Sequence, residues 1–183
     1  MKKLLSFAII TIIVSFIANN SIAQQSTTAS TNVKIVLTDF ITAENAAQSS
    51  AGTVPGSASV EFNYPDAASY KADKTMTVAG HLKLTATKGF EVKVKAAGAE
   101  FENGTNKIPV SVLDITPAVP ADGGTASNVT LSSTDQTILS GAKSGMKTID
   151  VTYKIPASKA QLHILGKPQG TYQQTVIYTF SQQ

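Results

Sequence analysis

The sequence predicts an all-β fold, an immunoglobulin-like, Greek-key antiparallel β-sandwich of about seven to nine strands. Two patterns carry this prediction. Short runs of residues alternate between apolar and polar side chains with a period of two, and clusters of Gly, Pro, Asn, Asp and Ser separate these runs. A third observation agrees, since no long stretch has helical periodicity. Only a single helical turn is expected after Pro65 or near Gly141.

The alternating runs define the expected strands in chain order. Within each run the apolar residues share one parity, so they are expected to face the core. They are Val33, Ile35 and Leu37; Val60, Phe62 and Tyr64; Leu82, Leu84 and Ala86; Phe90, Val92 and Val94; Ile149, Val151 and Tyr153; and Tyr172, Val176, Tyr178 and Phe180.

Residues 1–23 have the layout of a secretory signal peptide. Two lysines precede an almost wholly apolar run, Leu4 to Ala18, and Ser21-Ile22-Ala23 is a small-x-small cleavage signal. The alternative is an uncleaved anchor, but the run is shorter than the ~20 residues that span a bilayer. We expect cleavage after Ala23 and export to the periplasm, cell surface or medium. Residues 24–31 are polar, which predicts a flexible leader, and we expect residues 32–183 to form a single domain.

The composition excludes several classes of site. The chain has no cysteine, and its fifteen basic residues are all lysine. Disulfides, thiolate metal sites, cysteine nucleophiles and bidentate arginine contacts are therefore impossible. After signal cleavage, thirteen lysines face twelve acids, so no nucleic-acid partner and no further membrane span are expected.

The most explicit local prediction is a hairpin across Thr87-Lys88-Gly89. A two-residue loop would set Leu84 against a lysine, whereas a three-residue loop sets Leu84 against Val92 and keeps one face apolar. The same register places a candidate basic outer face on one sheet. This face is either an ordinary solvated surface or a surface for an anionic partner such as an acidic glycan. Its residues are Lys83, Lys93 and Lys95.

A search for catalytic or metal-binding groups finds no constellation. His81 and His163 each lack a second ligand at metal spacing, and no serine lies in a nucleophile elbow. Glu100 and Glu102 flank Phe101 and could share a face as a calcium site or a glycosidase pair, but a solvated edge before a turn explains them as well. We therefore predict no catalytic residue, no metal ligand and no cofactor, and hence no enzyme.

The last strand resembles the C-terminal strand of chaperone–usher pilins and of spore-coat-U-like pilins. Gly170 is the fourteenth residue from the end, and Tyr172, Val176, Tyr178 and Phe180 alternate after it, although Gln182 stands where those pilins have a penultimate tyrosine. The resemblance implies a sandwich that lacks one strand, which a neighbour's N-terminal segment supplies by strand addition. The candidate donor is then 31–40, which carries Val33, Ile35 and Leu37. The alternative is that this segment is the first strand of its own sandwich.

Two further resemblances widen the choice of function. Tyr178-Thr179-Phe180 is similar to the end of W-x-L cell-wall-binding domains, and the whole mature chain looks like small exported β-sandwich proteins of Bacteroidetes-type bacteria. We predict a non-enzymatic, fimbria-like surface-assembly subunit whose partner is a second copy or another surface subunit. The alternative is a carbohydrate- or envelope-binding module, for which Tyr70 and Phe101 are the candidate exposed aromatic residues.

Overall fold

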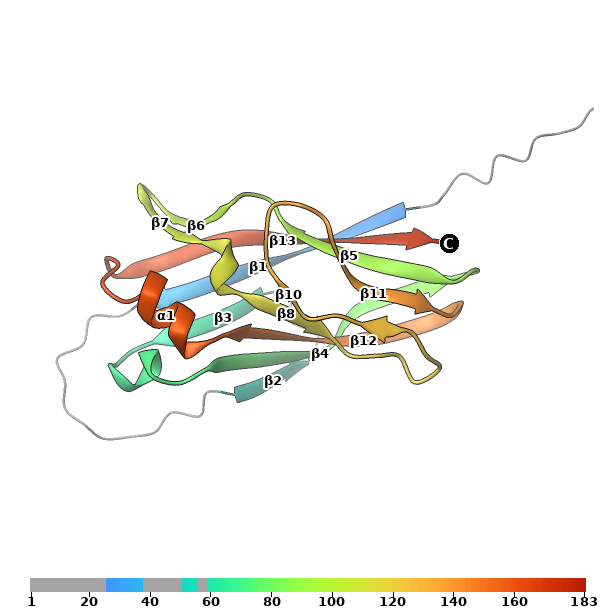
Figure 1. The fold of residues 1–183 in the computed structure, drawn as a ribbon, viewed down its shortest axis with the longest axis horizontal. Coiled ribbons are helices and arrows are strands. Elements are labelled where there is room, and N and C mark those ends of the chain that lie inside the picture. Colours follow the sequence, from blue (N-terminus) through green and yellow to red (C-terminus); the bar gives the residue numbers. More distant parts are fainter. Residues whose placement is uncertain (1–25, 38–50, 56–58) are drawn as a thin grey trace, which may run out of the picture.

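The computed structural model describes residues 26–37, 51–55 and 59–183. In these residues two β-sheets pack face to face, with one short α-helix at one end (Figure 1), and this confirms the all-β sandwich. The predicted signal peptide, 1–23, lies outside the described residues. Within the described part, no helix is long and apolar enough to cross a membrane.

The larger sheet, sheet A, has eight strands. Its path runs β3-β1-β13-β5-β11-β9, and β6 joins it by pairing with both β13 and β7. The strands are β1 (Ser26–Leu37), β3 (Ser59–Tyr64), β5 (Phe90–Ala96), β6 (Glu100–Asn103), β7 (Asn106–Pro109), β9 (Thr125–Ala126), β11 (Gln136–Ala142) and β13 (Gly170–Gln182).

The smaller sheet, sheet B, has five strands in the order β10-β8-β12-β4-β2. The two sheets together hold more strands than the seven to nine expected, because several are only two to four residues long. The elements are β2 (Ala51–Pro55), β4 (Lys74–Ala86), β8 (Asp114–Pro117), β10 (Val129–Thr130) and β12 (Gly145–Ile155), with the 3-10 turns η1 (Ala68–Tyr70) and η2 (Val110–Val112) and the helix α1 (Ala157–His163).

The core lies between the sheets and is built from the apolar residues that the alternation predicts to face inward. In β13 the four side chains of the alternating run are all buried, and β3 alternates strictly between exposed and buried residues. Leu84 is the partial exception, since it is half-buried against the core rather than within it. The alternation therefore places the right faces inward in both sheets.

The strand order contains that of an immunoglobulin-type sandwich, although another part of the chain supplies one of the strands, β2 runs parallel to β4, and sheet A carries additional strands. In such sandwiches strands A, B, E and D form one sheet and C, F and G the other. Sheet B follows the first order as β2-β4-β12-β8, and β5 and β13 take the places of C and F. The place of strand G, beside F, is taken by β1 from the N-terminal part of the chain.

The predicted hairpin across Thr87-Lys88-Gly89 is wrong. β4 pairs with β12 and β2 in sheet B, whereas β5 pairs with β13 and β11 in sheet A. Residues 87–89 therefore form an arch that carries the chain from one sheet to the other. Leu84 and Val92 face the same core from opposite sides, so the arch buries the same apolar side chains as the hairpin would. Apolar matching consequently could not distinguish the two.

Two other local expectations differ from the structure. β1 begins at Ser26, inside the segment 24–31 that was expected to be a flexible leader. Strand pairing uses main-chain groups, so a Ser- and Thr-rich segment can extend a strand without apolar side chains. The helical turn after Pro65 is present as η1, but the region around Gly141 is strand, and α1 was not expected.

Candidate functional site

The N-terminal strand β1 lies between the last strand of the sandwich and β3. It pairs antiparallel with β13 along its whole length, from Ser26 opposite Ser181 to Leu37 opposite Gly170. On its other side it pairs in parallel with β3, from Asn32 opposite Ser59 onward. The chain thus places a segment near its start into the middle of sheet A, at a position that completes the sandwich.

The inward side chains of β1 fill the groove between its two neighbours, β3 and β13. Val33 and Ile35 are fully buried, and Thr31 is 3% exposed. Ile35 pairs with Tyr172 on β13 and with Phe62 on β3, both of which belong to the core. The side chain of Leu37, the third residue of the predicted donor set, lies outside the described residues, as do residues 38–40.

The two halves of β1 have different surroundings. Asn32 to Leu37 pairs with a strand on each side, whereas for Ser26 to Thr31 the ladder to β13 is the only one among the described residues. Residues 28–30 are accordingly exposed, although they belong to a regular strand. β1 is therefore anchored through its C-terminal half.

Gly170 opens the strand that borders β1. Its φ is +143°, a backbone conformation that residues other than glycine rarely adopt. A Cβ at this position would collide with the side chain of Asn103. The glycine therefore lets the β6–β7 turn close against the start of β13, directly beside Leu37.

The hydroxyl of Tyr172 fixes the same end of the groove. It donates a hydrogen bond of 2.8 Å to the carbonyl oxygen of Pro168 and also interacts with Asn103. Burial raises the pKa of Tyr172, while the Asn103 hydrogen bond acts in the opposite direction. The ring thus belongs to the core while its polar end holds the segment that follows α1.

A buried chain of polar groups joins β13 to the opposite sheet. The hydroxyl oxygens of Tyr153 on β12 and Tyr178 on β13 lie 2.5 Å apart, and Tyr153 Oη lies 2.8 Å from His81 Nε2 on β4. Burial raises the pKa of both tyrosines. Gly80, with φ +60° and its N–H bonded to Asp150, lies in a β-bulge over residues 79–81 that also contains the histidine. No motif in the sequence indicates a role for His81, and the glycine before it within a strand is the available signal.

At the C-terminal end of β3, Tyr64 packs against Lys74 and Tyr70. Lys74 is 7% exposed, and its Nζ lies 5.7 Å from the ring centroid of Tyr64. Burial lowers the pKa of Lys74, partly offset by the charge of Asp66. The ring of Tyr64 also contacts Tyr70, with centroids 4.9 Å apart. These contacts hold β3 against β4 and η1, so this wall of the groove belongs to the body of the sandwich.

The lysines of the candidate basic face do not share a face. Lys83 lies on β4 in sheet B, whereas Lys93 and Lys95 lie on β5 in sheet A. The face depended on the hairpin that the structure replaces with an arch. In addition, Lys93 pairs with Glu91 at 2.9 Å and Lys95 with Asp135 at 3.3 Å, so acids accompany both lysines of sheet A.

The aromatic residues expected at the surface are buried. Tyr70 is 6% exposed and Phe101 0%, so neither can stack on a sugar from solvent. Glu102, beside Phe101, pairs with Lys107 at 3.3 Å rather than with a second acid. Across the described part of the chain, no three His, Asp or Glu residues are grouped as a metal site would require. The carbohydrate-binding alternative thereby loses the residues on which it rested.

Comparisons with known proteins find a distant likeness to a solved structure. No protein-family model matches the chain, and no curated protein matches it. A solved structure, an antigen and type I fimbria protein of Burkholderia pseudomallei, is similar over 85% of this chain and 99% of that chain, with 15% sequence identity and a TM-score of 0.42. At that score the likeness carries no argument about this protein.

Proposed function

We propose that this protein is a non-enzymatic, exported subunit of a surface assembly, and that copies are joined by strand addition through residues 26–37. The observation that carries the proposal is the position of β1, an N-terminal strand that fills the place of strand G between β3 and β13. It is connected to the rest of the domain only through residues 38–50 and the short strand β2. A second copy offers an identical segment to the same groove.

The chemistry of the groove supports this reading. Strand addition takes its affinity from main-chain hydrogen bonds and its register from alternate side chains that enter pockets. β1 supplies a ladder on both sides and buries Val33 and Ile35 in the core. Exchange between copies leaves these contacts unchanged, so it costs little beyond the entropy of association.

The test removes the strand and then returns it. Chains that begin at residue 24 and at residue 38 are compared by unboiled SDS gel electrophoresis and negative-stain imaging. We expect the longer chain to form species larger than a monomer and the truncated chain to form none. A synthetic peptide of residues 26–37 should restore thermal stability to the truncated chain, whereas the same peptide with Val33→Asp and Ile35→Asp should not.

Two outcomes would overturn the proposal. One is a truncated chain that assembles as well as the longer chain, because β1 would then be dispensable. The other is a longer chain that stays monomeric at every concentration tested and after refolding from denaturant. Rescue by the wild-type peptide separates a missing strand from a chain that has simply lost the ability to fold.

A further inference from the structure

We infer that copies that exchange β1 meet through the end of the sandwich that carries α1, and that Leu162 and Leu165 form the contact between them. This inference rests on the proposed strand exchange and names the surface that the exchange brings together. The partner is a second copy of this chain, in an arrangement with the two α1 ends facing each other.

The first argument is where the strand leaves the groove and where the rest of the chain begins. β1 ends at Leu37, which pairs with Gly170, the residue that opens β13 shortly after α1. β2 begins at Ala51, which pairs with Thr75 near the start of β4. Figure 1 shows both of these points at the end of the sandwich that holds α1 and η1.

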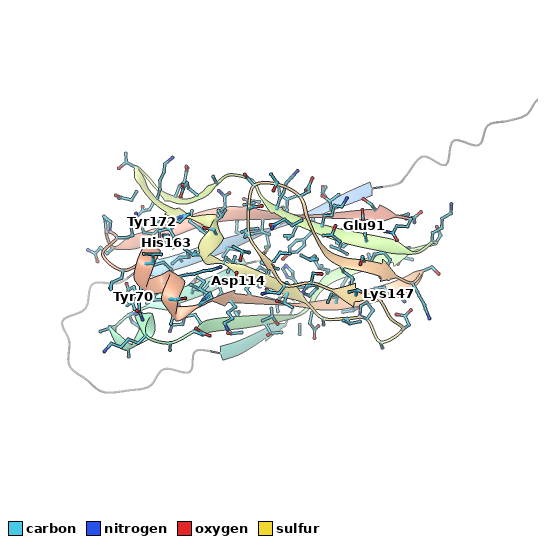
Figure 2. All side chains as sticks on the ribbon, viewed as in Figure 1. Tyr70, Glu91, Asp114, Lys147, His163 and Tyr172 are labelled. Atoms are coloured by element: carbon cyan, nitrogen blue, oxygen red, sulfur yellow. The ribbon has the colours of Figure 1, made fainter. Side chains whose placement is uncertain are left out.

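Hydrogen bonds tie α1 to this same end. Gln161 Nε2 donates to the carbonyl oxygen of Tyr70, and the N–H of Ala157 donates to Asp73. In Figure 2, Tyr70, His163 and Tyr172 lie together at this end, and Glu91 and Lys147 lie toward the opposite one. The exit of β1, the entry of β2 and the helix are thus neighbours.

The polarity of these strands restricts how two copies can be joined. A donated β1 leaves the acceptor at the acceptor's α1 end, and the donor's own domain begins at the donor's α1 end. A head-to-tail order would therefore require residues 38–50 to run along the length of a sandwich. The 13 residues of β13 span about 44 Å, which nearly equals the full reach of thirteen extended residues, roughly 45 Å. With the α1 ends together, that span disappears.

The surface at this end suits contact with an identical surface. Leu162 is 74% exposed and Leu165 is 51% exposed, so two large apolar side chains face solvent, one in the last turn of α1 and one in the turn that follows the helix. Residues 160–166 contain no Asp, Glu or Lys, and hence a copy that presents the same segment meets no like charge within it. A twofold arrangement places each patch on its counterpart and lets each copy donate β1 to the other.

The chain contains no cysteine, so single introduced cysteines report the arrangement directly. Leu165→Cys probes the α1 end, and Met146→Cys probes the opposite end at a residue that is 84% exposed. Mild oxidation of the assembled fraction should link Leu165→Cys chains to each other and should leave Met146→Cys chains unlinked. In a mixture of the two variants, no link between unlike chains is expected.

The double variant Leu162→Lys, Leu165→Lys should raise at least tenfold the protein concentration at which half of the chains are assembled. The control variant Met146→Lys should leave this concentration unchanged. Dominant links between the two unlike cysteine variants, or an assembly that forms without links at residue 165, would overturn this inference while strand exchange stands. If no assembly forms in any variant or in the wild-type chain, the proposed exchange fails and this inference fails with it.

Discussion

Ile35 on β1 lies directly opposite Tyr172 on β13, the strand that ends the chain, and both side chains are fully buried. On its other side the same isoleucine pairs with Phe62. One residue of the N-terminal strand thus joins an early and a late strand of the fold. The stability of the sandwich and its proposed assembly therefore depend on the same contacts.

Truncation of Ile35 should destabilise the protein strongly. Ile35→Ala leaves a cavity among core residues, and we expect the free energy of unfolding to fall by about 2–5 kcal/mol. Val36→Ala, which removes a half-buried side chain of opposite parity on the same strand, is the matched control and should cost less than about 1 kcal/mol. Urea unfolding followed by circular dichroism measures both. Equal losses in the two variants would mean that β1 does not hold this register.

Gly170 should not tolerate a side chain. Gly170→Ala introduces a Cβ at φ +143° and pushes it into Asn103, so we expect a loss of at least about 1 kcal/mol. In an Asn103→Ala background the collision is relieved but the backbone strain remains, and hence the cost should fall without vanishing. A double-mutant cycle from chemical denaturation measures this coupling. A cost that is the same in both backgrounds would contradict the close approach.

The tyrosine pair between the sheets should behave as a coupled unit. Tyr153→Phe removes the hydroxyl that contacts both Tyr178 and His81, and we expect a loss of about 1–3 kcal/mol because buried polar atoms lose a partner. Tyr178→Phe removes only one contact and should cost less. The double variant should cost less than the sum of the single changes. Strict additivity would show that the two hydroxyls do not interact in solution.

Alkaline pH should destabilise the fold through these tyrosines. Burial raises the pKa of Tyr153 and Tyr178 above the ordinary value of 10.0, so the folded state keeps protons that the unfolded chain releases. The stabilisation is complete below pH 10 and is lost as the pH rises above it, by up to about 1.4 kcal/mol per pH unit for each group. Unfolding free energies measured from pH 9 to 11 should show a shallower decline in the Tyr153→Phe, Tyr178→Phe double variant. Identical slopes would contradict the assignment.

The sequence predicts the strands far better than it predicts their partners. Alternation places Phe62, Val92 and Tyr178 on the inner faces correctly, because burial depends only on parity within a strand. The hairpin prediction failed because Leu84 and Val92 satisfy the same core either side by side in one sheet or across two sheets. Nothing local in residues 87–89 distinguishes an arch from a hairpin turn.

In the candidate site, too, the sequence predicts the strand but not its neighbours. The alternation of Val33 and Ile35 marks a strand, but only the fold shows that this strand lies between β3 and β13. Tyr70 and Phe101 are the candidate exposed aromatic residues because they lie outside the alternating runs, but tertiary packing buries both. The contact between Tyr153 and Tyr178 joins residues of different sheets, so no spacing in the sequence could have indicated it.

The central claim, that β1 is exchanged between copies, is tested most directly by a disulfide across the ladder. Lys34 and Gln173 are directly paired on neighbouring strands, and such pairs lie at a separation that a disulfide can bridge. The Lys34→Cys, Gln173→Cys variant is assembled under reducing conditions, oxidised, and analysed by non-reducing denaturing electrophoresis. Strand exchange predicts covalently linked chains that revert to monomers on reduction. An assembled sample in which every disulfide lies within a single chain would contradict the account.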